Sequence, residues 1–255
     1  MGKKFVDNFR VIEVKALNSS NYFIEIKSEK DLPEIRPGQF VNVEVKDTNE
    51  VFLRRPFSIF EVDYSKNTIS LIVKILGRGS KKLTEIKREE TVSIIYPLGK
   101  GFTCPETNDK ILLIGGGSGV APMLFLAKSS GIKNVDIILG AKTKQDHIDV
   151  NEYSKYAKLH FTTEDGSSGE KGYVTNHTVF QQLNNFTKIY ACGPEAMMKV
   201  IAKEAQKAGI FCEVSLENLM ACGFGVCLCC IESTKKGNLC VCTEGPVFNI
   251  NDLKW

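Results

Sequence analysis

The chain has 255 residues, of which 43% are apolar and 25% are charged, and its formal net charge at pH 7 is +3. This length favours two domains over one, and no apolar run approaches the about 20 residues of a membrane-spanning helix, so we do not expect a membrane protein. Basic and acidic residues are interleaved along the whole chain, which argues against a nucleic-acid partner.

The N-terminus and the cysteine count both indicate a reducing compartment. Lys3 and Lys4 are followed by Asp7 before any apolar segment begins, so no secretory signal is expected. The chain has nine cysteines, an odd number that leaves at least one of them unpaired. We therefore expect a cytoplasmic protein without disulfides.

Residues 1–103 are predicted to form an antiparallel β-barrel. Apolar and polar side chains alternate in segments 22–27, 40–45 and 68–74, as they do in strands with one buried face. Turns rich in glycine, proline and asparagine separate these segments, and such short punctuated strands are typical of a small barrel. The one helical candidate in this region is the short polar segment 80–86.

After Lys110 the pattern becomes that of a parallel α/β domain, which we assign to residues 109–214. A continuous apolar strand is predicted at 111–114 and further strands at 135–139, 158–162 and 188–192, with helices at 123–128 and 195–208. Strands that are buried on both faces and separated by helices form parallel sheets. Cys104 begins the connector between the two domains, and we expect Cys104 and Cys212 to be buried as small apolar side chains.

The last segment, residues 215–255, is rich in cysteine and has little apolar periodicity. A segment of this size with so few core residues needs a metal ion or a cluster to order it. The predicted fold class is therefore an α+β multidomain protein, with an N-terminal antiparallel barrel, a parallel-sheet nucleotide domain and a small C-terminal cluster domain.

Two turns at the carboxyl ends of predicted parallel strands indicate a nucleotide site. The first contains Gly115, Gly116, Gly117 and Gly119, and the second contains Cys192, Gly193 and Pro194. Glycine lets a pyrophosphate approach the amides at a helix N-terminus, and ligands bind beyond the carboxyl ends of such strands. The dinucleotide fingerprint is incomplete because Val120 replaces its third glycine, so turns with a purely structural role remain an alternative.

A second unusual motif, Arg54-Arg55-Pro56, lies within an otherwise apolar strand of the predicted barrel. One interpretation is an edge strand protected by charge, since proline is tolerated at an edge. The other is a flavin site, in which Arg55 binds a diphosphate and Ser58 hydrogen-bonds the flavin ring. Gly79, at the start of the short helix, would then direct amides to the same diphosphate.

These motifs together resemble the ferredoxin–NADP reductase superfamily in their order and approximate spacing. The resemblance spans about residues 5–215 and implies a barrel that binds FAD, followed by a domain that binds a pyridine nucleotide. The flavin contacts that it implies are Arg55, Pro56, Phe57, Ser58, Ile72, Val73, Lys74, Gly79 and Ser80.

The cysteines of the last segment are open to two interpretations from their spacing alone. Cys222-x4-Cys227-x2-Cys230 is the plant-type spacing for three ligands of a [2Fe–2S] cluster, whose fourth cysteine lies further along. Four thiolates could instead close a tetrahedral zinc site, with Cys240 and Cys242 beside Cys227 and Cys230. The spacing also does not decide between Cys240 and Cys242 as the fourth cluster ligand.

Segments 215–230 and 242–248 resemble the electron-transfer subunit of dihydroorotate dehydrogenase B. The resemblance implies a [2Fe–2S] cluster held by Cys222, Cys227, Cys230 and Cys242, with Cys229 and Cys240 left spare. It also implies an FMN-containing dihydroorotate dehydrogenase catalytic subunit as partner, in a heterotetramer of two of each chain.

In that family, electrons pass from dihydroorotate through the partner, the cluster and FAD to NAD+, in pyrimidine biosynthesis. We identify no residues suited to abstract a proton from dihydroorotate, so we assign no catalytic residue and expect the isolated chain not to oxidise it. Lys142 and Lys144, which follow the second strand of the nucleotide domain, leave NADP open as the nucleotide. The choice of NAD therefore follows only from the resemblance. The alternatives are a diaphorase subunit of a hydrogenase, glutamate synthase-like or bifurcating complex, and a zinc-stabilised nucleotide-binding module.

Overall fold

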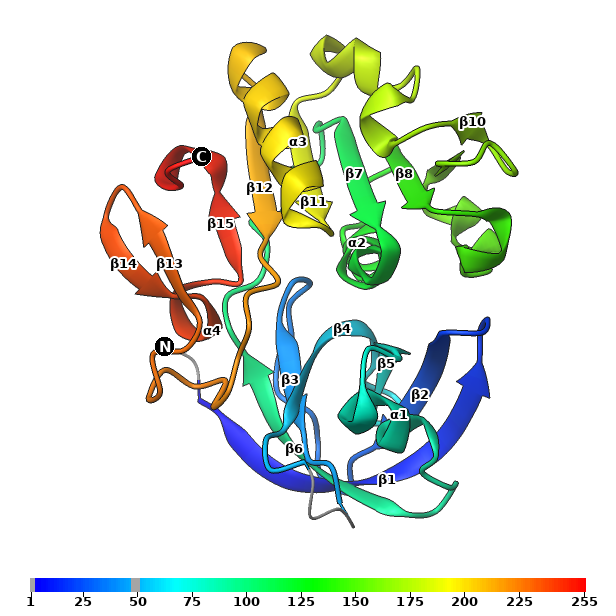
Figure 1. Ribbon diagram of the computed structural model, residues 1–255, viewed down its shortest axis with the longest axis vertical. Helices are drawn as coiled ribbons and strands as arrows, with labels where there is room; N and C mark the ends of the chain where they lie inside the picture. Colours follow the sequence, from blue (N-terminus) through cyan, green and yellow to red (C-terminus); the bar gives the residue numbers. More distant parts are fainter. Residues whose placement is uncertain (1–2, 47–50) are drawn as a thin grey trace.

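The computed structural model describes residues 3–46 and 51–255, and its N-terminal part is a closed antiparallel barrel (Figure 1). Its strands are β1 (Phe5–Ala16), β2 (Asn21–Lys27), β3 (Phe40–Val43), β4 (Arg55–Asp63), β5 (Thr68–Lys74) and β6 (Thr91–Leu98), and the short helix α1 (Arg78–Thr84) follows β5. The order around the barrel is β1-β2-β5-β4-β3-β6, and β1 closes it by pairing with both β2 and β6.

Alternation along these strands fills the barrel with apolar side chains, as the sequence predicts. Val11, Ile24, Ile59 and Leu71 come from four different strands and are almost fully buried in one cluster. Strand β4 lies between β5 and β3 and is not an edge strand, but its pairing with β5 ends at Ile59, so Pro56 pairs only with β3 and lies where proline is tolerated.

The second part is a sheet of seven strands, β10-β9-β8-β7-β11-β12-β15, all parallel except the last. The strands are β7 (Ile111–Gly116), β8 (Val135–Ala141), β9 (Lys158–Thr163), β10 (Glu170–Lys171), β11 (Lys188–Cys192), β12 (Phe211–Ser215) and β15 (Val247–Asn249). Its helices are α2 (Val120–Ser129) and α3 (Glu195–Lys207). Short 3-10 turns occur along the same part of the chain and after β15: η1 (Gly117–Gly119), η2 (Lys144–Asp146), η3 (Asn151–Lys155), η4 (Val174–Asn176), η5 (Phe180–Asn185) and η6 (Ile250–Asp252).

The two helices cover opposite faces of this sheet because successive side chains of a strand point to opposite sides. Leu112 and Ile114 of β7 pack with α3, whereas Ile111 and Leu113 pack with α2. Helix α2 also faces the barrel, where Glu61 of β4 accepts a hydrogen bond from Lys128. The predicted parallel α/β domain is therefore confirmed.

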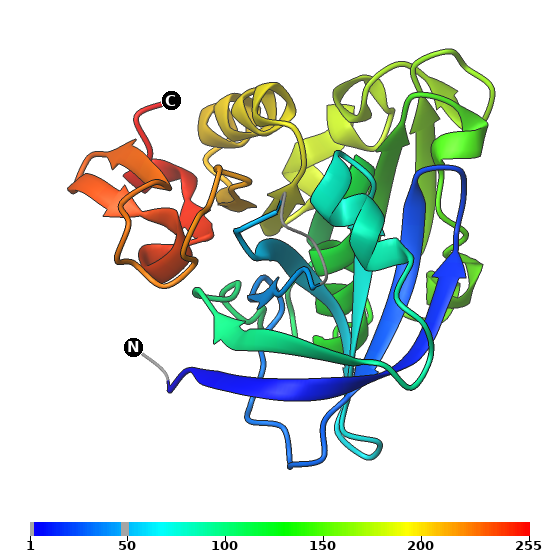
Figure 2. The same ribbon diagram turned by 60° about the horizontal axis from the view of Figure 1, so that its bottom comes forward.

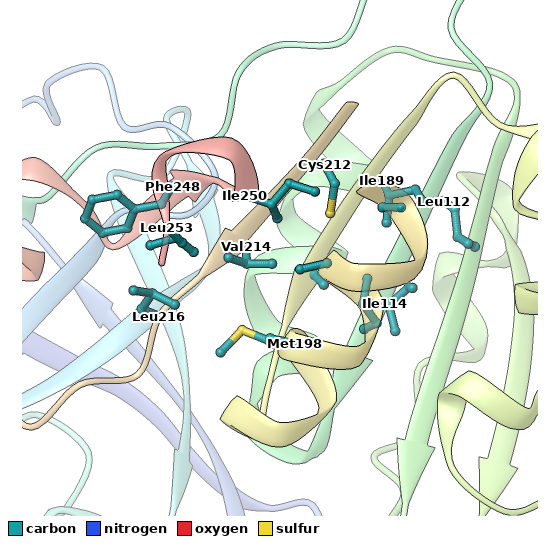
Figure 3. Packing of buried hydrophobic residues seen from close by; sticks show 14 of the residues in the cluster. Leu112, Ile114, Ile189, Met198, Cys212, Val214, Leu216, Phe248, Ile250 and Leu253 are labelled. Carbon is teal, nitrogen blue, oxygen red and sulfur yellow. The ribbon is translucent and has the colours of Figure 1, made fainter. Parts of the chain in front are cut away.

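The C-terminal segment packs against both other parts, as the turned view makes clear (Figure 2). It contains a hairpin of β13 (Ile231–Thr234) and β14 (Gly237–Cys240), the short helix α4 (Val241–Glu244) and β15. Strand β15 pairs antiparallel with β12, and Phe248 and Leu253 lie beside Val214 of β12 and Leu216, which directly follows that strand (Figure 3). On the barrel side, Lys100 forms an ion pair of 2.7 Å with Glu244.

The cysteines outside the tail behave differently from one another. Cys212, on β12, is buried as predicted, but Cys104 is exposed, so that prediction is wrong. Cys104 belongs to the connector after the barrel, which runs over the surface and gives an apolar side chain nothing to pack against. All nine cysteines lie in the described part of the chain, and none forms a disulfide. Among the helices of the described residues, none is both long and apolar enough to cross a membrane.

Candidate functional site

The strand order brings the two predicted nucleotide-binding turns together. From β7 the chain adds β8 and β9 on one side of the sheet, and it later adds β11 and β12 on the other side of β7. The strand order therefore reverses between β7 and β11. Ligands of open parallel sheets bind in the crevice at this reversal. Cys192 is the register partner of Gly115, so both turns leave the sheet at this crevice.

The glycines of the first turn have two different roles. A Cβ atom would lie 2.9 Å from Val120 Cα at Gly115, 2.8 Å from Met197 Sδ at Gly116 and 2.2 Å from Cys192 O at Gly119. These three glycines therefore allow close packing of the turn on the rest of the domain. Gly117 differs, because its φ is +58° and the nearest atom to its Cβ position is Lys74 Nζ, at 3.9 Å. Gly117 is thus the position at which the backbone faces open space that a phosphate could enter.

Strands β4 and β5 stop pairing where the sequence predicts flavin contacts, and we call this unpaired stretch, residues 55–58 and 72–74, the flavin slot. Pairing of these strands begins at Asp63 with Thr68 and ends at Ile59 with Leu71. The segments 55–58 and 72–74 continue both strands beyond this point, and each is paired only with its outer neighbour. Their facing backbone amides and carbonyls are therefore available to a polar ring such as that of a flavin.

Arg55 lies at the mouth of this slot, against the start of α1. A Cβ atom at Gly79 would be 2.7 Å from Arg55 Nε, so the absence of a side chain brings the guanidinium onto the helix backbone. Arg55 also donates a hydrogen bond of 2.8 Å to the carbonyl of Leu53, which fixes its position. A fixed guanidinium beside helix-start amides suits a diphosphate. Ser80 accepts hydrogen bonds from Leu76 N at 2.8 Å and Gly77 N at 3.2 Å, so its hydroxyl closes the turn before the helix.

Glu217 is a site residue that sequence reasoning missed. Its carboxylate lies 3.9 Å from the thiol of Cys192, and burial raises the pKa of both groups. Lys74, from the flavin slot, opposes this effect at Glu217 by attracting its negative charge. One acid thus interacts with both the nucleotide turn and the barrel. The available signal was its position two residues after a buried strand, where side chains enter the crevice.

The structure gathers the four predicted ligand cysteines in two pairs. Cys222 and Cys227 each accept a hydrogen bond of 3.5 Å on sulfur from the other residue's amide. The amide of Cys242 donates to the sulfur of Cys230 at 3.4 Å, and both of these residues are buried. Within the described residues, no three histidine, cysteine or acidic side chains are placed to hold a single metal ion. Two pairs of thiols suit a [2Fe–2S] cluster, in which each iron takes two of the four ligands, better than one tetrahedral zinc ion.

Amides around the first pair are directed at its sulfurs. Burial of Cys222 disfavours the thiolate, but hydrogen bonds from the amides of Phe224 and Cys227 outweigh it and lower the pKa of Cys222 to about 6. Gly223 and Gly225 make this wrapping possible, with φ values of +79° and +91°. The loop is therefore prepared to hold a thiolate, the form that binds iron.

The two remaining cysteines of the tail lie at the edge of this group. Cys229 is exposed, and its amide donates to the sulfur of Cys227 at 3.5 Å. Cys240 is partly exposed; burial raises its pKa, and the charges of Cys230 and Cys222 raise it further. Cys240 therefore lies close to the other cysteines of the group and is an alternative fourth ligand. The choice of Cys242 remains a prediction.

Three family models match the chain in the order of these sites. An oxidoreductase FAD-binding domain matches residues 9–102, and an oxidoreductase NAD-binding domain matches residues 113–203. The iron–sulfur cluster binding domain of dihydroorotate dehydrogenase B matches residues 217–254.

Similar chains match this one over nearly their whole length. An electron transfer subunit of dihydroorotate dehydrogenase B (NAD(+)) from Fusobacterium nucleatum is 36% identical and covers 98% of each chain. The subunit of that name from Clostridium acetobutylicum is 39% identical over 96% of this chain and 95% of its own. A solved structure of an NADH-dependent reduced ferredoxin-NADP oxidoreductase, described in the context of flavin-based electron bifurcation, is 28% identical. It covers 97% of this chain and 90% of its own, with a TM-score of 0.85.

Proposed function

The chain belongs to the family of electron-transfer subunits of dihydroorotate dehydrogenase B, and we propose that it passes electrons from a dihydroorotate-oxidising partner to NAD+. FAD, a [2Fe–2S] cluster and NAD are its cofactors, and its role belongs to pyrimidine biosynthesis in the cytoplasm. The observation that carries this proposal is the sequence identity of 36% to the Fusobacterium nucleatum subunit. The match covers 98% of both chains and therefore all three sites.

The residues of the chain divide the work between binding and positioning. When bound, FAD exchanges a hydride with a nicotinamide and single electrons with an iron–sulfur cluster. The slot between residues 55–58 and 72–74 holds the flavin ring, and Arg55 with Gly79 and Ser80 holds its diphosphate. The turn at Gly117 would bind the pyrophosphate of NAD, and residues 192–194 would contact its nicotinamide.

The proposed cluster ligands follow the two sulfur pairs. Cys222 and Cys227 would bind one iron, and Cys230 and Cys242 would bind the other. Amides directed at the sulfur of Cys222 stabilise its negative charge when the ligand is deprotonated.

We also propose that the catalytic partner contains FMN, docks at the cluster loop and assembles with this chain as two copies of each. Val226 and Leu228 of that loop expose most of their side chains, and Phe224 is also exposed. Exposed apolar residues grouped in one loop are typical of an interaction surface. A partner bound there would deliver electrons directly to the cluster.

The test combines composition with activity. The purified chain should be brown, contain FAD, and contain iron and sulfide in equal amounts. NADH should bleach its flavin without a partner, whereas dihydroorotate should reduce NAD+ only after the catalytic subunit is added. A colourless protein that contains only zinc, or dihydroorotate oxidation by the chain alone, would refute the proposal.

A second candidate is a diaphorase subunit of another flavin and iron–sulfur complex. The observation in its favour is the ferredoxin-NADP oxidoreductase structure, which matches this chain with a TM-score of 0.85. Affinity purification from cells separates the candidates. A dihydroorotate dehydrogenase that copurifies in stoichiometric amount supports the first candidate, and a ferredoxin-linked or hydrogenase subunit in its place supports the second.

A further inference from the structure

We infer that Asn42 is a positioning residue. It fixes the cluster loop, residues 222–230, to barrel strand β3, which pairs with the flavin-binding segment of β4. This inference rests on the proposed function. Asn42 lies on β3, and its Nδ2 donates a hydrogen bond of 2.9 Å to the carbonyl of Cys222. Its side chain is almost completely buried, with 1% of its surface exposed. The bond therefore joins the barrel to a proposed cluster ligand across 180 positions of the sequence.

Asn42 also has a fixed relation to the flavin slot. In the pairing of β3 with β4, Asn42 is the register partner of Pro56, within the segment that is predicted to contact the flavin. One strand pair thus separates this segment from the cluster loop. A short connection of this kind, made of one strand pair and one side-chain hydrogen bond, sets the distance between two redox groups, because strands of a closed barrel do not slide past each other.

The cluster loop is shaped to accept this contact. A Cβ atom at Gly223 would lie 2.7 Å from Asn42 Nδ2, so a side chain there would displace either the loop or the asparagine amide. The φ of Gly223 is +79°, which also favours glycine. Two consecutive residues, Cys222 and Gly223, therefore meet the same asparagine amide.

Barrel stability does not account for an asparagine at this position. Its Oδ1 is buried and has no hydrogen-bond partner among the described residues. An unpaired buried acceptor costs free energy, whereas leucine has the same branched shape and would pack in the barrel without that cost. What the asparagine adds is the hydrogen bond to the Cys222 carbonyl.

The test compares Asn42→Leu and Asn42→Ala with Thr68→Val. The two Asn42 variants remove the same donor with different changes of volume, so at least one should fold. Thr68 is a matched control, because it is a buried polar barrel residue whose hydroxyl bonds Glu25 at 3.2 Å, within the barrel. Each variant is prepared as the full chain with its cofactors, and its FAD content is measured first.

Loss of the hydrogen bond should release the loop more often. A bond of about 1 kcal/mol corresponds to about fivefold more of the undocked loop, so a chelator should remove iron about fivefold faster from the Asn42 variants. Their reduced-cluster EPR spectrum should change. After mixing with NADH, their flavin should bleach at the wild-type rate while cluster reduction slows. Thr68→Val should match the wild type in all of these measurements.

Two outcomes would overturn the inference. One is wild-type iron release, EPR spectrum and cluster reduction in both Asn42 variants. The other is the same set of changes in Thr68→Val, which would mean that any damage to the barrel produces them. Absence of a cluster in the wild-type chain is a separate result, since it refutes the proposed function and the inference with it.

Discussion

Replacing Gly119 by alanine tests the contact between the two turns of the nucleotide crevice. A Cβ atom at Gly119 would lie 2.2 Å from the carbonyl oxygen of Cys192 and 2.4 Å from its carbonyl carbon. Both are backbone atoms, so the clash is relieved only when the two turns move apart. Gly119 has a φ of −65°, which alanine adopts freely, so the cost is steric and amounts to about 1–3 kcal/mol.

Binding of NAD+ to the variant has to restore the original contact between the turns, so the steric cost is subtracted from the free energy of binding. The Kd for NAD+ should rise by about 5-fold to 150-fold, since about 1.4 kcal/mol corresponds to a factor of ten. Isothermal titration of the chain loaded with FAD measures this change. FAD content should stay at the wild-type value, because Gly119 belongs to the nucleotide domain.

Gly131→Ala is the matched control for this prediction. Gly131 has a φ of +68°, and no atom lies within 4 Å of its Cβ position. Alanine there should cost about 1–2 kcal/mol through the backbone alone, so the melting temperature should fall while the Kd for NAD+ stays unchanged. Wild-type affinity in Gly119→Ala, or an equal loss of affinity in Gly131→Ala, would refute the steric argument.

Three further predictions concern other parts of the chain. Cys242→Ser should lose its iron while Cys240→Ser retains it, and iron analysis that gives the opposite result would exchange the two roles. Glu213→Gln should lower the free energy of unfolding by about 1.5–3 kcal/mol, because Glu213 accepts hydrogen bonds of 2.8 and 2.7 Å from Thr103 at the domain junction; an unchanged denaturation midpoint would contradict this. Desolvation raises the pKa of Glu217 above its ordinary value of 4.5, so ionisation favours the unfolded chain, and Glu217→Gln should gain stability over the wild type as pH rises above 4.5. A difference in melting temperature that does not vary with pH would contradict that sign.

Several elements could be predicted from the sequence because a local pattern determines each of them. The apolar segment 111–114 lies within β7, and the segment 188–192 is β11. The apolar segments 111–114, 135–139 and 188–192 alternate with helical segments, and this pattern favours strands of a parallel sheet that are buried on both faces. The cysteine spacing likewise brings Cys222 and Cys227 together, because a short loop with glycines must fold back on itself.

Other features depend on contacts between distant segments and have no local signal. Strand β15 has three residues, and it becomes a strand because β12 offers it a free edge. The packing role of Gly119 depends on where β11 ends, which its own neighbours do not reveal. Glu217 acquires its raised pKa from desolvation beside Cys192, and its position after a strand indicates the crevice but not this contact with a distant segment.

The segment after β12 connects the three sites physically. Its glutamate, Glu217, lies between Cys192 of the nucleotide turn and the charge of Lys74 in the flavin slot. Five residues later, Cys222 binds the barrel through Asn42 and begins the cluster loop. Between them the chain crosses from the nucleotide sheet to the barrel. A displacement of this segment would therefore change the surroundings of the nicotinamide, the flavin and the cluster together, so the three sites should respond jointly to a partner that binds the cluster loop.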